Sequence, residues 1–102
     1  MQESPLTGSQ KTFLRGQGQL LAPTLKVGKV GLTQAFFAEF DKALRLRELV
    51  KLRFLGADRD ERALWCARIA GEGRCTCVGA VGHTALFYRR NPEPAGRRIE
   101  LP

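Results

Sequence analysis

The spacing of apolar residues changes several times along the chain, and each change marks a predicted element. Thr7 and Gln10 have the spacing of a capping box, in which each side chain satisfies a backbone N–H of the other residue. A short helix is therefore predicted over residues 9–16, ended by Gly16 and Gly18. The pattern leaves open where this helix lies relative to the rest of the chain.

A second predicted helix carries an aromatic stripe. Phe36, Phe37, Phe40 and Leu44 recur at intervals of three and four residues, which places them on one side of a helix. Thr33 precedes the stripe and is a good N-cap. We expect this helix to pack through its aromatic side.

A third helix is predicted to begin after Asp58. This residue can act as the N-cap, with Glu61 three residues later. Leu64, Trp65 and Ile69 are expected to form the apolar side of the helix, and glycines follow it.

Four strands are predicted over residues 25–27, 48–55, 74–81 and 84–88, the last two joined as a hairpin near residues 82 and 83. In the second strand, apolar residues alternate with Lys51 and Arg53, so these two cations should face away from the helices. The resulting order is helix, strand, helix, strand, helix, strand, strand. It predicts an α/β fold, a two-layer sandwich with one mixed four-stranded sheet.

Length and composition favour one domain with a basic surface. The chain has 102 residues, of which we assign 1–5 to a flexible tail, 6–90 to the domain and 91–102 to an extended C-terminal tail. Lys and Arg number 17 against 10 Asp and Glu, a net charge of +7. Such a charge favours nucleic acid, an anionic membrane surface or an acidic protein as partner.

Other features narrow these classes. The first residues do not resemble a signal peptide, and no apolar run approaches the ~18 residues of a membrane span, so we expect a cytoplasmic protein with no membrane partner. Three cysteines do not suggest a disulfide framework. Cys66, Cys75, Cys77 and His83 lack the spacing of known zinc sites, so neither metal nor cofactor is expected. With one histidine and no recognisable nucleophile–base pair, we do not expect an enzyme.

The segment Gly28-Lys29-Val30-Gly31 is the main candidate for chemistry. With 11 glycines in 102 residues, about one G-x-x-G match is expected by chance. A second match, residues 79–82, lies in predicted strands, where glycine more often marks a bulge or close packing. The first match leaves a strand and enters a capped helix, where free N–H groups and the helix dipole favour a phosphate. The alternative is a plain turn that needs glycine for its dihedral angles.

An ordered set of short segments resembles a known family. These segments are Leu6-Thr7, Gln10-Lys11, Leu14-Arg15, LKVGKVGLT at 25–33, ELVKL at 48–52, Asp58-Arg59 with Glu61, Gly82 with Thr84, Leu86 with Tyr88-Arg89, and RIELP at 98–102. Together they resemble the CRM domain, in particular its stand-alone bacterial, YhbY-like form. The resemblance implies a sheet and helices similar to the C-terminal domain of translation initiation factor three. It also implies RNA binding on precursors of the large ribosomal subunit, the pre-50S particle.

The candidate RNA-binding residues come from this resemblance and from the strand pattern. They are Lys11, Arg15, Lys26, Gly28, Lys29, Val30, Gly31, Lys51, Arg53, His83 and Arg89. His83 stands where relatives usually carry Lys or Arg, so a phosphate contact there would be weaker. Lys11 and Arg15 share one side of the first helix and are also explained as a solvated surface. Trp65 is expected in the core, whereas Tyr88 is left open between core packing and base stacking.

Two functional hypotheses remain. The first is a monomeric protein that grips the RNA backbone and acts in maturation of the large ribosomal subunit. The second is a ribosome-associated protein-interaction module with only non-specific affinity for RNA. Partners that persist after RNA digestion would favour the second.

Overall fold

The computed structural model describes residues 5–28 and 30–102; residues 1–4 of the predicted tail, and Lys29, lie outside this part. The elements in chain order are α1 (Gly8–Gln19), β1 (Leu25–Val27), α2 (Gln34–Arg47), β2 (Leu49–Phe54), α3 (Arg59–Glu72), β3 (Thr76–Val81), β4 (Thr84–Tyr88) and the 3-10 turn η1 (Pro94–Gly96). The predicted order of helices and strands and the mixed four-stranded sheet are confirmed.

The sheet has the strand order β1-β2-β4-β3. β1 and β2 are parallel, while β4 runs antiparallel to both of its neighbours, β2 and β3. The carboxyl ends of β1 and β2 therefore lie at the same end of the sheet, and the turn between β3 and β4 lies there too. We call this end of the sheet the loop end; it comprises Gly28 and residues 30–33, 55–58 and 81–83.

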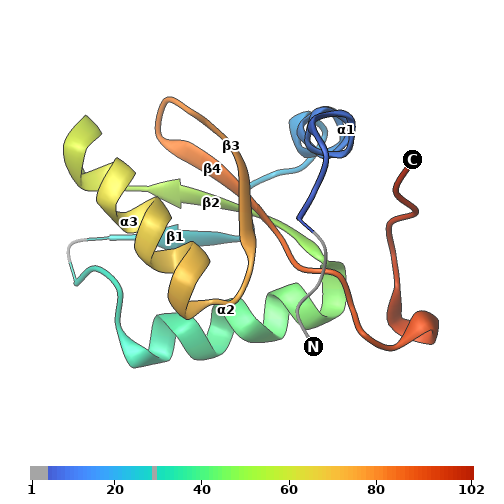
Figure 1. The fold of residues 1–102 in the computed structure, drawn as a ribbon. Helices are drawn as coiled ribbons and strands as arrows, with labels where there is room; N and C mark the ends of the chain where they lie inside the picture. Colours follow the sequence, from blue (N-terminus) through green and yellow to red (C-terminus); the bar gives the residue numbers. More distant parts are fainter. Residues whose placement is uncertain (1–4, 29) are drawn as a thin grey trace.

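One face of the sheet is covered by α2 and α3 and is called the two-helix face. Val50, Leu52 and Phe54 of β2 alternate onto this face and are buried there. Phe40 of α2 meets Phe87 of β4 edge to face, with ring centroids 5.6 Å apart. Figure 1 shows α2 and α3 on this side, and the aromatic stripe predicted for α2 points into the main core.

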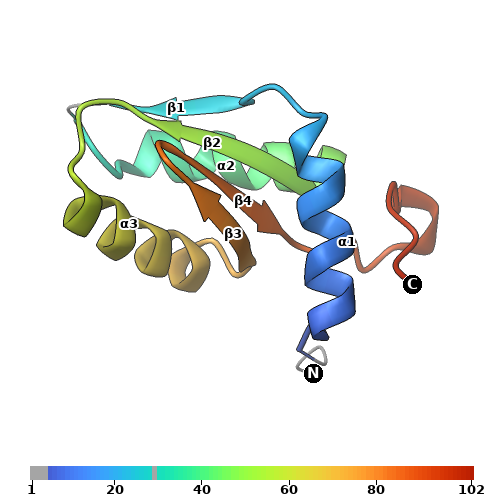
Figure 2. The ribbon, with the colours of Figure 1, turned by 90° about the horizontal axis from the view of Figure 1, so that it is seen from above.

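The opposite face carries α1 and is called the α1 face. Leu14 is fully buried there, in a second apolar cluster with Leu49, Val78 and Tyr88. Figure 2 shows α1 crossing the sheet away from the loop end, so the helix covers only part of this face. The two predicted layers are thus joined by a third, partial layer that the sequence pattern did not place.

The predicted end of α1 was wrong, because the helix runs through both glycines to Gln19. At Gly18 a Cβ atom would lie 2.2 Å from Leu86 Cδ1, so the absence of a side chain lets α1 approach the sheet. Lys51 Nζ then donates to the carbonyl oxygens of Gly18 and Leu21, at 3.3 and 3.2 Å. These contacts offset the cost of glycine in a helix and satisfy carbonyls that a helix end leaves open.

The predicted apolar side of α3 was wrong at one residue. Leu64 is 70% exposed, whereas Ile69 is fully buried and Trp65 packs on Phe54 with ring centroids 5.9 Å apart. Trp65 and Ile69 are four residues apart and share one side of the helix. Leu64 is about 100° from Trp65 around the axis and faces away.

Glu48 was predicted as the start of a strand but ends α2 as its C-cap, with φ +64°. Its side chain is fully buried. The carboxylate accepts from the backbone N–H groups of Asn91, Arg98 and Ile99, at 2.7, 2.6 and 2.9 Å. The C-terminal segment, expected to be extended, instead turns through η1 and folds back, with Ile99 packed in the second cluster.

Replacing Glu48 with Ala should destabilise the fold by about 2–4 kcal/mol, because three partly buried N–H groups lose their acceptor. Urea unfolding followed by circular dichroism measures this change. The control is Glu39→Ala, an exposed glutamate of α2, which should change the free energy of unfolding by less than about 0.5 kcal/mol. Equal stability of the two variants would show that the carboxylate does not fasten the C-terminal segment.

Candidate nucleic-acid interface

The segment from Gly28 to Gly31 forms a tight turn at the loop end. The N–H of Gly31 donates to the carbonyl oxygen of Gly28 at 2.9 Å. Gly31 has φ +76°, so its glycine is needed for the backbone conformation. A Cβ at Gly28 would meet no atom within 4 Å, and Val30 is 84% exposed. The turn is therefore open to solvent at Gly28 and Val30; Lys29 stays a prediction.

Contacts with the segment after β2, with α3 and with the start of α2 hold this turn in place. The N–H of Leu55 donates to the carbonyl oxygen of Val27 at 2.8 Å, which ties the segment after β2 to the end of β1. A Cβ at Gly31 would lie 3.8 Å from the Trp65 ring. Thr33 caps α2 by accepting from the N–H of Phe36 at 3.0 Å, as predicted. The turn thus leads directly into a helix N-terminus.

Lys26 and Arg53 lie side by side on the α1 face, next to the loop end. They are paired in the parallel register of β1 and β2, and both side chains are exposed. The predicted orientation of Arg53 and Lys51 away from the two-helix face is confirmed by the alternating burial of β2. The row continues across the sheet, since Arg53 pairs with Thr84 and Thr84 pairs with Val81.

Three further candidate cations lie on the α1 face and differ in how many hydrogen bonds they make with the protein. Lys51 is half-buried and holds the end of α1, as described above. Arg15 donates from Nη1 to the carbonyl oxygen of Val78 at 2.9 Å and from Nη2 to Thr12 Oγ1 at 3.2 Å. Lys11 is half-buried on the same helix. We name Lys11, Arg15, Lys26, Lys51 and Arg53 the basic face.

His83 lies exposed in the turn between β3 and β4. Beside it lies Arg62, a cation that the sequence pattern did not place at the site. Arg62 Nη1 lies 3.3 Å from His83 Nδ1 and donates to the carbonyl oxygen of Ala57 at 2.8 Å. A full positive charge therefore sits beside the histidine. The two residues are 21 positions apart, and only the packing of α3 against the hairpin brings them together.

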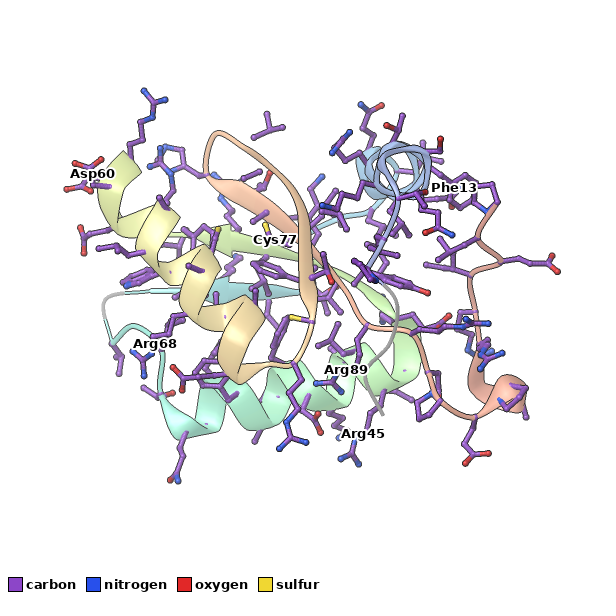
Figure 3. All side chains as sticks on the ribbon, in the orientation of Figure 1. Phe13, Arg45, Asp60, Arg68, Cys77 and Arg89 are labelled. Carbon is purple, nitrogen blue, oxygen red and sulfur yellow. The ribbon has the colours of Figure 1, made fainter. Side chains whose placement is uncertain are left out.

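Arg89 lies apart from the other candidate RNA-binding residues. Its guanidinium forms an ion pair with Asp41 at 2.8 Å and donates to the carbonyl oxygens of Gly73 and Arg74, at 2.6 and 3.3 Å. Figure 3 shows Arg89 near Arg45 of α2, far from Asp60 at the start of α3. These contacts join α2, the end of α3 and β4, so the structure gives Arg89 a bracing position.

The aromatic candidates lie in the core. Tyr88 is only 4% exposed and belongs to the cluster beneath α1. Trp65, for which a core position was predicted, is partly buried and packs on Phe54 against the main core. The geometry therefore favours core packing for Tyr88, the alternative that the sequence left open.

Charge is divided between the two sides of the sheet. α1 and the four strands contain no Asp or Glu, yet they carry all five cations of the basic face. By contrast, α2 and α3 contain acidic residues among their cations: Glu39, Asp41, Asp60, Glu61 and Glu72. The uncompensated positive potential therefore lies on the α1 face. Across residues 5–28 and 30–102, no helix has the length and apolarity needed to cross a membrane.

The cysteines lie on the two-helix side and form a separate feature. A hydrogen bond between the thiols of Cys66 and Cys77 lowers the pKa of Cys77 to about 7 and raises the pKa of Cys66. Burial raises the pKa of Cys75 to about 12. Within the described part of the chain, no three His, Cys, Asp or Glu residues are grouped to hold a metal ion. The three cysteines pack against the main core on the two-helix side.

Known proteins resemble the chain over most of its length. "Probable RNA-binding protein PA4753" of Pseudomonas aeruginosa is 37% identical over 89 residues, which cover 87% of this chain and 86% of that protein. An "RNA-binding protein" of Haemophilus influenzae is 36% identical over 97 residues, covering 95% of both chains. The solution structure of the hypothetical protein SAV1595 from Staphylococcus aureus superposes with a TM-score of 0.82 and 30% identity, covering 96% of this chain and 100% of that one.

The family comparison agrees with the fold and with the ordered sequence segments. The model of the CRS1 / YhbY (CRM) domain matches residues 6–89, from the residue before the cap of α1 to the residue after β4. The chain therefore belongs to the CRS1/YhbY (CRM) domain family.

Proposed function

We propose that this protein binds RNA through the sugar-phosphate backbone, using the basic face and the turn from Gly28 to Gly31. The division of charge supports this function most strongly, because α1 and the four strands hold five cations and no acidic residue. Phosphates neutralised there release counterions, which is the main source of sequence-independent affinity. Relatives covering almost the whole chain are named as RNA-binding proteins, in agreement with this proposal.

The parts of the site have different roles in the proposal. Lys26 and Arg53 are exposed and adjacent, so they are suited to contact neighbouring phosphates directly. Gly28 leaves space for a phosphate to approach the backbone and the start of α2. Lys51 and Arg89 have protein partners and contribute mainly by holding α1 and β4 in place. His83 joins the site through the charge of Arg62.

We further propose that the RNA is a precursor of the large ribosomal subunit and that the protein acts as a cytoplasmic monomer on the pre-50S particle. This part rests on the resemblance to the stand-alone bacterial form of the family. Backbone contacts favour a structured RNA, whose shape rather than sequence would select the site. We assign no catalytic step to the protein.

Replacing Gly28 with Asp should weaken binding to a structured ribosomal RNA fragment about tenfold or more, because a carboxylate would repel the phosphate. Gly28 has no φ constraint and no close neighbour, so the fold should persist. Gly31→Asp gives the same charge but adds backbone strain at φ +76°. Fluorescence anisotropy measures the affinity, and thermal unfolding checks the fold.

The matched control is Gly71→Asp, which adds the same charge at a position that is also free of close neighbours. α3 begins next to the loop end, and Gly71 lies about 18 Å along the helix from its first residue. This distance is well beyond the ~8 Å screening length at physiological salt, so the added charge should not reach the loop end. This variant should bind within about twofold of the unmodified protein. Equal affinity of folded Gly28→Asp and Gly71→Asp proteins would remove the turn from the site.

Affinity should fall steeply with salt, with a slope of log K against log salt of roughly −3 to −5 for about four to six neutralised phosphates. Lys26→Ala and Arg53→Ala should each reduce the slope by about one, whereas Lys42→Ala, on α2, should leave it unchanged. Anisotropy titrations at several salt concentrations measure these slopes. A flat salt response, or the same slope in all variants, would contradict phosphate contact by the basic face.

A further inference from the structure

A groove of about 300 Å³ lies on the α1 face between the end of α1 and the β3–β4 hairpin. Its lining includes Arg15, Gln19, Gly79, Val81, Thr84 and Leu86. This volume is at the small end of the range for ligand pockets, which is ~300–1,000 Å³, and suits one planar ring system. The groove lies beside Arg53, because Thr84 of its lining is paired with Arg53 in the sheet, and Arg53 is paired in turn with Lys26.

One wall of the groove is held in place before any ligand binds. A Cβ at Gly79 would lie 2.8 Å from Arg15 Cδ, so the bare strand lets the arginine stem lie flat against it. The two hydrogen bonds of Arg15, to Val78 and Thr12, then fix its guanidinium. A fixed guanidinium plane is a stacking partner for a nucleobase, and its prior ordering lowers the cost of binding.

The other groups around the groove match the edge and the face of a base. Gln19 is exposed, and among the described residues its side-chain amide has no protein partner. That amide offers one donor and one acceptor side, the pair that matches N7 and N6 of adenine. The Thr84 hydroxyl donates to the carbonyl oxygen of Val81 at 3.0 Å and keeps its lone pairs as acceptors. Val81, 79% exposed, adds apolar surface.

The charge around the groove identifies the kind of occupant. Arg15 and Lys51 line it, Arg53 lies next to it, and the surrounding helix and strands contain no acidic residue. We propose that the groove binds one unpaired nucleobase, adenine by preference, of an RNA whose phosphates lie on the basic face. This inference rests on the proposed function and adds a base contact to it. An apolar peptide would leave this positive charge without a partner.

The test compares a short single-stranded oligoadenylate with the matching abasic ribose-phosphate oligomer, which has the same charge and no bases. The protein should bind oligoadenylate roughly fivefold or more tightly, because a stacked base contributes beyond the phosphates. Gln19→Ala combined with Thr84→Val should reduce the affinity for oligoadenylate roughly 5- to 150-fold, because each lost side chain lowers it roughly two- to twelvefold. Affinity for the abasic oligomer should stay within about twofold.

Gln17→Ala, an exposed glutamine of α1 outside the groove lining, is the control and should bind both oligomers like the unmodified protein. If the double variant does not fold, Gln19→Ala alone should still lower oligoadenylate affinity roughly two- to twelvefold. Equal binding of both oligomers by all variants would overturn the base site and leave backbone binding intact. Binding of neither oligomer would overturn the base site, and the proposed function would fall with it if the structured ribosomal RNA fragment did not bind either. Concentration-dependent shifts of groove amides without RNA would assign the groove to a second copy and also overturn the base site.

Discussion

Side chains along β2 alternate between the two faces of the sheet, and this alternation determines where the helices and the cations lie. Successive residues of a strand point to opposite faces, so Val50, Leu52 and Phe54 all lie on the face that packs against α2 and α3. Lys51 and Arg53 then must lie on the other face, because a shift of one residue would bury both cations. A central strand with this pattern gives one sheet two chemically different faces.

α1 covers the part of the α1 face that is far from the loop end and leaves the rest exposed. Two contacts of the helix with the sheet determine this position. Gly18 lets the helix approach Leu86, and Lys51 satisfies carbonyl oxygens at the end of the helix. The same lysine that alternation places on this face therefore supports the helix that covers part of it. What remains open is the row through Lys26 and Arg53 and the groove beside it. Since α1 and the strands lack acidic residues, the open part keeps an uncompensated positive charge.

Local signals in the sequence predicted most of the fold, and long-range contacts account for what they missed. The capping boxes at Thr7 and Asp58, the aromatic stripe of α2 and the alternation of β2 each depend on neighbours within a few residues, and the structure confirms them. The course of α1 through Gly18 depends on Leu86, 68 positions later along the chain. The C-terminal segment is fastened by Glu48, a residue whose pattern resembled the start of a strand. For the candidate site, periodicity predicted Arg53 on the open face, but no local signal joined Arg62 to His83 or tied Arg89 to Asp41.

We expect RNA to contact the α1 face and the loop end rather than the outer surfaces of α2 and α3. Amide chemical-shift mapping of the isotopically labelled protein, titrated with a structured ribosomal RNA fragment, tests this most directly. We expect the largest shifts at Lys26, Gly28 and Arg53, with small shifts at Lys42 and Arg68. Shifts centred on α2 and α3, with the Lys26 and Arg53 amides unmoved, would contradict this expectation.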